Sequence, residues 1–284
     1  MNAGACWITG AGGLIGSHLA RSATKFAPDW QVLPLTRERL DLTDFSAVRR
    51  RYEEDRPRLV IHCAALSSTP ACEVESNRAW KINFEATATL CELARDTRLV
   101  FFSTDLVFDG KTGGYDESAP VNPLTVYAWT KMEAEKVVLS NPRHIVTRTS
   151  LNGGVSPTGD RGFNEQMRKA WSAGETLRLF VDEFRSPIPA AVTAQGVWEL
   201  AINAPGGLYH LAGAERLSRL ELGRLLAARC SDLKPRIEAI SLKDFKGVPR
   251  SPDTSLNCDK VQRLLSFRLP ALTDWLRKHP EADF

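Results

Sequence analysis

The chain has 284 residues, of which 43% are hydrophobic and 25% charged, and its formal net charge is +3. This length allows one large domain or two modest ones, and the composition excludes a disordered chain. Basic and acidic residues are interspersed, as in RRRYEED at residues 49–55, which is typical of a solvated helix face. We therefore expect no nucleic-acid partner.

The six cysteines are scattered, without a CxxC pair and without histidines at metal-ligand spacing, so we expect no metal site. No window is apolar over the length of a membrane span, and the N-terminus lacks the basic lead of a signal peptide. We expect no membrane association, and a reducing, cytoplasmic setting fits best.

Short apolar runs alternate with helix-period segments through about residue 150. We predict strands at residues 5–9, 31–35, 59–63, 99–103 and 144–149, and helices at residues 14–23, 45–55, 76–96 and 124–140. The strands are continuously apolar, which is typical of a parallel sheet covered by helices on both faces. The repeated β-α order therefore predicts an α/β fold with a Rossmann-type, doubly wound parallel sheet.

The alternation breaks after residue 150. A Gly/Pro/Asp loop at 152–162 precedes a helix at 163–172 and a strand at 177–181, and the tail is predicted to hold helices at 218–230, 259–264 and 272–279. A helix at 192–204 and the strand GLYHLAG look like a return to the sheet. We predict an NAD(P)-binding domain at 1–150, with 190–212 returning to it, and a smaller C-terminal substrate-binding cap formed by 151–189 and 213–284.

A glycine-rich turn follows the first predicted strand. WITGAGGLIGSHLA places Gly10, Gly13 and Gly16 at three-residue intervals before the first helix. Such glycines allow a tight turn, the approach of a pyrophosphate to backbone N–H groups, and close helix–strand packing, while the helix N-terminus attracts the phosphates. In this strand–turn–helix context the motif predicts dinucleotide binding.

The end of the second strand decides which dinucleotide is favoured. A carboxylate there would bind the ribose 2′-hydroxyl, but this chain has Thr36 and Arg37. A guanidinium near the 2′-oxygen favours NADP(H), with NAD(H) left open. The alternative is a solvent-exposed Arg37 beside Glu38 and Arg39. Asp41, a few residues further, could reach the adenine edge.

The sequence resembles extended short-chain dehydrogenases/reductases and, within them, the dTDP-4-dehydrorhamnose reductase-like (RmlD-like) branch. The matching pieces run in family order along nearly the whole chain: TGAGGLIGSHL, DLTD, IHCAAL, CEVESNRAWKIN, FFSTDLVFDG, YAWTK, VTRTS, DEFRSPIPA, GLYHLAG and PRSPDTSLNCDK. The resemblance implies a catalytic trio of Thr104, Tyr127 and Lys131, in which Lys131 also holds the nicotinamide ribose. With the trio's Tyr127 and Lys131, we expect the cofactor site to comprise Gly10, Gly13, Leu14, Ile15, Gly16, Arg37, Asp41, Leu42, Cys63, Ala64, Ala65, Asn83 and Ser103.

The chemistry of the trio follows from its groups. Reducing a ketone requires a hydride on carbon and a proton on oxygen, and a free tyrosine has a pKa of about 10. Lys131 follows Tyr127 by four residues, on the same helix face, where its ammonium would stabilise the phenolate. Thr104 would donate a hydrogen bond to the carbonyl oxygen. The alternatives are surface packing for the pair, a turn-forming hydroxyl for Thr104 and a structural role for Asn83.

Two departures from related families bear on the substrate. Dehydratases that resemble this chain have Thr-Asp-Glu at the strand end, whereas Leu106 here cannot transfer a proton, so dehydration is disfavoured. Leu151 stands where rhamnose-pathway reductases have an aromatic residue, which leaves the exact sugar open. In the cap, Arg185 is the candidate for an anionic or sugar contact, with ion pairing to Asp182 or Glu183 as the alternative. The expected substrate contacts are Thr104, Asp105, Asn152 and Arg185.

We therefore expect an NADPH-dependent reductase of a 4-keto-6-deoxy sugar nucleotide, with a homodimer left open. Two other interpretations compete with it. One is a non-catalytic NADP-binding protein similar to the regulatory β subunit of methionine adenosyltransferase, against which the intact trio argues. The other is a sugar-nucleotide epimerase that retains NAD, against which Arg37 and the missing carboxylate after the second strand argue.

Overall fold

The computed structural model describes residues 3–282 and 284. The first half of the chain alternates strands and helices, as expected. In chain order its main elements are β1 (Gly4–Thr9), α1 (Leu14–Phe26), β2 (Trp30–Leu35), α2 (Phe45–Asp55), β3 (Leu59–His62), α5 (Ala86–Leu93), β4 (Arg98–Thr104), α6 (Val126–Leu139) and β5 (Ile145–Thr149).

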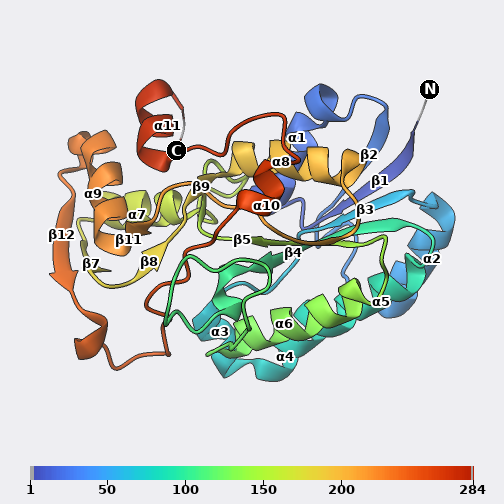
Figure 1. Cartoon of the computed structure of the whole chain (residues 1–284), viewed down its shortest axis with the longest axis horizontal. Coiled ribbons are helices and arrows are strands. Elements are labelled where there is room, and N and C mark those ends of the chain that lie inside the picture. The colour runs from blue at the N-terminus through green and yellow to red at the C-terminus, as the bar shows by residue number, and fades with distance from the viewer. Residues whose placement is uncertain (1–2, 283) are drawn as a thin grey trace.

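A six-stranded parallel sheet forms the centre, in the order β10-β5-β4-β3-β1-β2 (Figure 1). β10 (Gly207–His210) pairs with β5 at one edge, and α8 (Ala190–Asn203) precedes it. β1 pairs with β2 on one side and with β3 on the other, so the strand order reverses at β1. The predicted doubly wound parallel sheet is confirmed, and this reversal point is where such sheets bind ligands, at the carboxyl ends of the strands.

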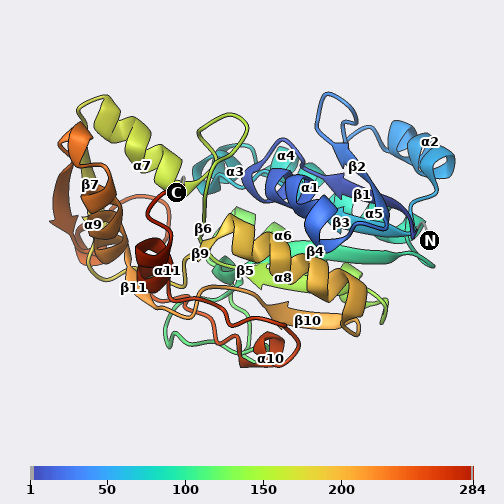
Figure 2. The ribbon, with the colours of Figure 1, turned by 90° about the horizontal axis from the view of Figure 1, so that it is seen from above.

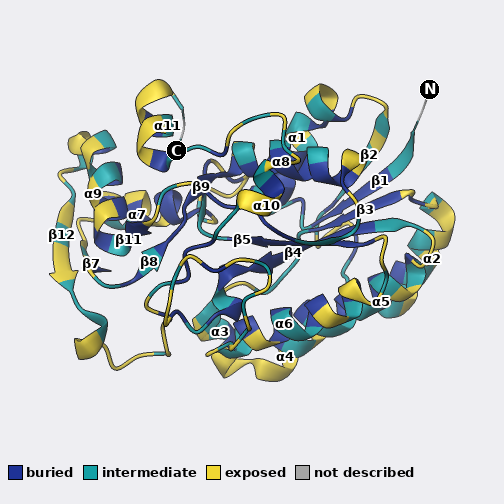
Figure 3. Ribbon diagram, viewed as in Figure 1, coloured by how far each residue is buried: buried dark blue, intermediate teal, exposed yellow. Residues whose placement is uncertain are grey.

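Helices cover both faces of the sheet. α1 and α8 lie on one face, and α2, α5 and α6 lie on the other (Figure 1). A hydrophobic core lies on each face of the sheet, and successive side chains of β1 pack alternately into the two cores. Cys6 and Ile8 pack with α1 and α8, while Trp7 packs with the opposite helices. Figure 3 shows the result, a buried sheet between helices whose outer faces are exposed.

The helical segment before β4 differs from the single helix expected at 76–96. It is divided into α4 (Ser76–Trp80), a π-helical turn, η1 (Lys81–Glu85), and α5. A further helix, α3 (Thr69–Val74), precedes them and was not expected. Its signal is local, because Ser68 caps its N-terminus and a proline lies in its first turn.

The cap has its own elements and its own core. It contains α7 (Phe163–Ser172), β7 (Thr176–Phe180), β8 (Phe184–Arg185), β11 (Leu217–Ser218), α9 (Arg219–Arg229), β12 (Arg236–Ile240) and α11 (Leu272–Lys278). β7 pairs with β12, a strand that was not expected, and β8 pairs with β11. Figures 1 and 2 show these elements beside the end of the sheet where β4 and β5 terminate.

Short elements link the two parts. β6 (Asn152–Gly153) pairs with β9 (Ile188–Pro189), and α10 (Asp259–Gln262) lies beside β10. Val261 and Leu269 belong to the core of α1 and α8, so this part of the tail packs on the sheet and its helices. None of the helices between residues 3 and 282 is long and apolar enough to cross a bilayer.

Candidate active site

The glycine turn between β1 and α1 is closely packed. Gly10 has a φ of +67°, and a Cβ atom there would lie 2.6 Å from the backbone nitrogen of Ala64. A Cβ on Gly16 would collide with the carbonyl oxygen of Gly10. Only glycine therefore fits at these two positions, where the turn approaches both the start of α1 and the segment after β3.

The N-terminus of α1 presents unpaired donors. Gly13 is the N-cap residue, so no side chain caps the helix, and the first turn carries no acidic residue. Among the described residues, no group accepts a hydrogen bond from the backbone N–H of Leu14, Ile15 or Gly16. Free N–H groups at the positive end of a helix dipole fit the pyrophosphate of a dinucleotide.

Thr36, directly after β2, borders this turn. Its Cγ2 would lie 3.7 Å from a Cβ on Gly12. Arg37 is 71% exposed and forms a loose ion pair with Asp41, with 3.6 Å between Nε and Oδ2. Asp41 also accepts hydrogen bonds from the backbone and hydroxyl of Thr43, and these lower its pKa. Arg37 and Asp41 thus lie in the exposed segment that follows Thr36 and pair with each other.

Hydrogen bonds with Thr9 of β1 hold the end of β3 and the segment after it in place. Thr9 and His62 are joined by a hydrogen bond of 2.7 Å, and the backbone N–H of Ala64 donates to the Thr9 hydroxyl. Burial raises the pKa of the Cys63 thiol, which is therefore neutral. Cys63 and Ala64 consequently lie beside Gly10. The resemblance implies that these two residues and Ala65 run along a cofactor. Leu42 packs instead against the core around Trp7.

Asn83 comes from the π-helical turn and points into the protein. Its Oδ1 accepts from the backbone N–H of Leu66 at 2.8 Å, and its Nδ2 donates to the carbonyl of Leu66 and to Thr130. It is fully buried. These contacts match the structural alternative, in which Asn83 holds the segment after β3 in place. Ser103 differs, because its buried hydroxyl oxygen has no hydrogen-bond partner among the described residues.

The structure brings Thr104 and Tyr127 together. Thr104 ends β4, and Tyr127 lies in the first turn of α6, which Thr125 caps by accepting from the backbone N–H of Ala128. Burial and the negative charge of Asp105 raise the pKa of Tyr127 above its ordinary value, and a hydrogen bond with Thr104 opposes this. The phenol is therefore protonated at neutral pH.

Lys131 lies one helical turn after Tyr127 and is only 2% exposed. Its Nζ is 3.9 Å from the centre of the Phe101 ring. Burial lowers the pKa of Lys131 to about 7, and the Glu135 carboxylate opposes that shift. Burial, together with the charge of Lys131, lowers the pKa of His62 to about 3.

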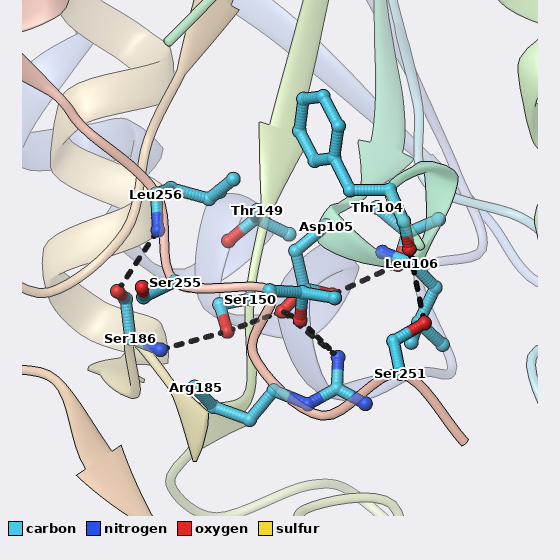
Figure 4. A network of polar contacts seen from close by, with 12 residues as sticks. Thr104, Asp105, Leu106, Thr149, Ser150, Arg185, Ser186, Ser251, Ser255 and Leu256 are labelled. Atoms are coloured by element: carbon cyan, nitrogen blue, oxygen red, sulfur yellow. Dashed lines mark hydrogen bonds and ion pairs between the residues drawn. The ribbon is translucent and has the colours of Figure 1, made fainter. Parts of the chain in front are cut away.

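The expected substrate residues of the cap junction form a buried network (Figure 4). Asp105 accepts hydrogen bonds from Thr104 at 3.2 Å, Ser150 at 2.6 Å and Thr254 at 3.1 Å. Arg185 pairs with Asp105, with 3.0 Å between Nη1 and Oδ2. The groups that were expected to face a substrate are thus largely engaged with one another.

Arg185 also pairs with Glu183 at 3.2 Å, which was one of the two alternative partners considered for it. The other, Asp182, instead accepts hydrogen bonds from Ser241 and Leu242. Asn152 is likewise engaged within the protein. It donates to Thr149 and to the backbone of Ser150, and it accepts from Thr193. We therefore assign Asn152 a structural role in the link between β5 and the cap.

A cavity of about 70 Å³ lies between the cap and the dinucleotide-binding half. Its lining combines the start of α3, the end of β4, the start of α6 and two cap segments: Thr69, Pro70, Leu106, Leu124, Thr125, Arg185, Val248, Pro249, Arg250 and Ser251. Arg250 pairs with Glu183 at 2.6 Å. The sequence interpretation missed Arg250, although it lies in the PRSPDTSLNCDK motif.

The charged residues among those that line this cavity are both cations, Arg185 and Arg250. The carboxylates that pair with them, Asp105 and Glu183, are not among the lining residues. Such a site favours an anionic ligand. In the described part of the chain, no group of three or more acidic, histidine or cysteine side chains could hold a metal ion.

Residues 5–281 match the family model described as the RmlD substrate binding domain. The chain belongs to this family. The expected RmlD-like branch is thus confirmed, and the match extends over both the sheet and the cap.

Individual relatives agree with the family. The dTDP-4-dehydrorhamnose reductase of Streptomyces griseus is 32% identical, over 80% of this chain and 78% of its own length. The methionine adenosyltransferase 2 subunit beta of Xenopus laevis is 25% identical, over 90% of this chain and 81% of its own. The crystal structure of dTDP-4-dehydrorhamnose reductase from Bacillus anthracis in complex with NADP has a TM-score of 0.87 at 24% identity, covering 97% of this chain and 98% of that one.

Proposed function

We propose that this RmlD-family protein is an NADPH-dependent reductase of a 4-keto-6-deoxy sugar nucleotide, similar to dTDP-4-dehydrorhamnose reductase. One observation carries the proposal. Thr104 and Tyr127 meet where β4 ends, and Lys131, one helical turn further along α6, interacts with Cys63, which borders Gly10 of the glycine turn. The relatives named as reductases support the same activity.

The chain's own groups fit the cofactor. The free N–H groups of Leu14, Ile15 and Gly16 would hold the pyrophosphate, in a turn where a side chain at position 10 or 16 has no room. Arg37, exposed at the end of β2, would pair with a 2′-phosphate. The reduced nicotinamide supplies a hydride when it is bound.

The remaining chemistry belongs to the trio. Thr104 would donate its hydroxyl proton to the substrate's carbonyl oxygen. Because a hydroxyl has one proton, Thr104 would first release the hydrogen bond that it donates to Asp105. Tyr127 would then deliver a proton to the developing alkoxide, and the ammonium of Lys131 would stabilise the phenolate left behind. Leu106 lines the adjoining cavity and has no proton to transfer, which disfavours dehydration.

The cavity between the cap and the sheet suits a negatively charged substrate. The guanidinium groups of Arg185 and Arg250, which line the cavity, would attract the diphosphate of a sugar nucleotide. Arg250 is the most accessible of the cations that line the cavity, since its side chain is 35% exposed while that of Arg185 is 8% exposed.

The proposal is tested by following NADPH absorbance with a panel of 4-keto-6-deoxy nucleotide sugars. We expect oxidation of NADPH with at least one member of the panel. Tight NADPH binding without oxidation by any member would instead favour a non-catalytic subunit, an alternative that the 25% identity to the methionine adenosyltransferase β subunit supports.

A further inference from the structure

Three ionisable residues follow one face of α6. Tyr127, Lys131 and Glu135 are four residues apart, so their side chains lie one above the other along the helix. Glu135 is only 4% exposed. A buried carboxylate is costly unless it is paired, and this one does not reach solvent from the core beneath α6.

Arg148, on β5, pairs with Glu135 through two parallel contacts. Nε donates to Oε1 at 2.9 Å and Nη2 donates to Oε2 at 2.7 Å, and each side chain is 5% exposed. The guanidinium continues away from α6, with Nη1 3.4 Å from His210 and its carbon 5.0 Å from the centre of the Phe108 ring. This two-point contact fixes the carboxylate in one orientation, with the negative charge on the side of α6.

Lys131 has no such partner of its own. Its ammonium lies over the Phe101 ring and makes no hydrogen bond or ion pair with the described residues. Burial lowers the pKa of Lys131 to about 7, and the Glu135 carboxylate is the foremost group that opposes this shift. An ammonium in apolar surroundings thus depends on one neighbouring carboxylate for its charge.

We propose that Glu135, held in place by Arg148, is a positioning residue that keeps Lys131 charged beside Tyr127. It touches no reacting atom and acts through the lysine alone. The consequence for the rate rests on the proposed function, whereas the effect on Lys131 does not. The titratable or charged groups that face Lys131 and this pair from neighbouring elements are Tyr127 on α6, His62 and Cys63 at the end of β3, Asp105 after β4, and His210 on β10.

The test is an NMR titration of the full chain labelled with ¹³C at lysine Cε, with the Lys131 signal assigned from Lys131→Met. We expect this signal to titrate near pH 7 in the unaltered chain and about one pH unit lower in Glu135→Gln. The matched control is Glu133→Gln, which removes a partly exposed carboxylate of the same helix that pairs with Lys136. It should leave the Lys131 midpoint unchanged.

Glu135→Gln leaves Arg148 as an unpaired buried charge, which could prevent folding. The double variant Glu135→Gln/Arg148→Met removes both charges together and carries the same expectation of a lower Lys131 midpoint. An unchanged midpoint in whichever variant folds would overturn the proposal.

The rate provides a second reading. In Glu135→Gln, kcat at pH 7 should fall about fivefold relative to the unaltered chain, because about half of the Lys131 side chains are protonated in the unaltered chain and about a tenth in the variant. The deficit should shrink as the pH is lowered and Lys131 regains its proton. A loss of the same size at every pH would show a purely structural role and would also overturn the proposal. The NMR titration needs no substrate, so its outcome is separate from that of the reductase assay.

Discussion

Arg185 of the cap and Asp105 at the end of β4 form a buried ion pair, with 3.0 Å between Nη1 and Oδ2 and side chains 8% and 4% exposed. The same carboxylate accepts a hydrogen bond from the Thr104 hydroxyl. The contact between cap and sheet and the orientation of Thr104 therefore depend on one side chain. This arrangement joins the stability of the protein to the geometry of its active site.

Removing the cap partner should cost stability. Arg185→Met leaves Asp105 without its cation in a buried setting, so we expect the free energy of unfolding to fall by about 3 kcal/mol. Urea denaturation measures this. Arg178→Met, which breaks an exposed pair with Glu238 in the same cap, should cost less than about 1 kcal/mol. Equal losses in the two variants would show that Arg185 contributes no more than a surface pair.

Tyr127→Phe removes the proposed proton donor and preserves the ring. Because general acid catalysis contributes about 100-fold to 10,000-fold, we expect kcat to fall within that range while the Kd for NADPH stays within about twofold. Stopped-flow reduction of a 4-keto-6-deoxy nucleotide sugar, with fluorescence titration of NADPH, measures both. A variant as active as the unaltered chain would remove Tyr127 from the mechanism.

Arg37→Asp should reverse the cofactor preference. The substitution replaces a cation at the end of β2 with a carboxylate, which repels a 2′-phosphate and accepts a hydrogen bond from a ribose hydroxyl. We expect the ratio of the NADPH and NADH dissociation constants to change by about 10-fold to 100-fold. Arg39→Asp makes the same change of charge two residues further, where Arg39 donates to the Pro34 carbonyl. A similar change of this ratio in both variants would indicate a general electrostatic effect and no specific contact of Arg37 with the 2′-phosphate.

Acid should destabilise the fold through its buried histidines. Burial lowers the pKa of His144 and of His210 to about 4 and that of His62 to about 3, whereas each is 6.5 in the unfolded chain. Below pH 6.5 the unfolded chain therefore binds more protons than the native one. The contribution of these histidines to stability should be constant above pH 6.5 and should decline as the pH falls from there toward 4.

His144 isolates one part of this effect, because neither of its ring nitrogens has a hydrogen-bond partner among the described residues. Leucine at position 144 cannot bind a proton. The free energy of unfolding of His144→Leu should therefore fall by about 2 kcal/mol less than that of the unaltered chain between pH 7 and pH 5. His279→Leu, which replaces an exposed histidine in the same way, is the matched control. Urea midpoints at the two pH values provide the comparison. An equal change in midpoint for His144→Leu and the unaltered chain would refute the lowered pKa of His144.

The periodic parts of the fold could be predicted from the sequence, because their signals are local. The helix at 45–55 and the helix at 163–172 have the expected ends, and each strand of the sheet in the first half lies within one or two residues of its expected place. β12 could not be predicted in this way. Most of its residues are at least partly exposed, and it is defined by pairing with β7, far away in the sequence.

The site divides in a similar way. The glycine turn and the Tyr–Lys spacing are short motifs on single elements, so their residues could be named from the sequence alone. The engagement of Asp105, Asn152 and Arg185 depends on contacts between distant segments, such as that of Arg185 with Thr254. The resemblance implied that Asn83 lies on the cofactor side. Its hydrogen bonds with Leu66 could not be predicted from the sequence, because Asn83 lies in a π-helical turn and its partner is distant in the chain.

The central claim is the transfer of a hydride from NADPH to a keto sugar, and isotopic labelling tests it most directly. The protein would be incubated with NADPH deuterated at the transferable C4 position and a 4-keto-6-deoxy nucleotide sugar, and the product analysed by mass spectrometry. We predict one deuterium on the sugar and stoichiometric NADP⁺. Bound NADPH that keeps its deuterium, with the sugar unchanged or merely epimerised, would contradict the account.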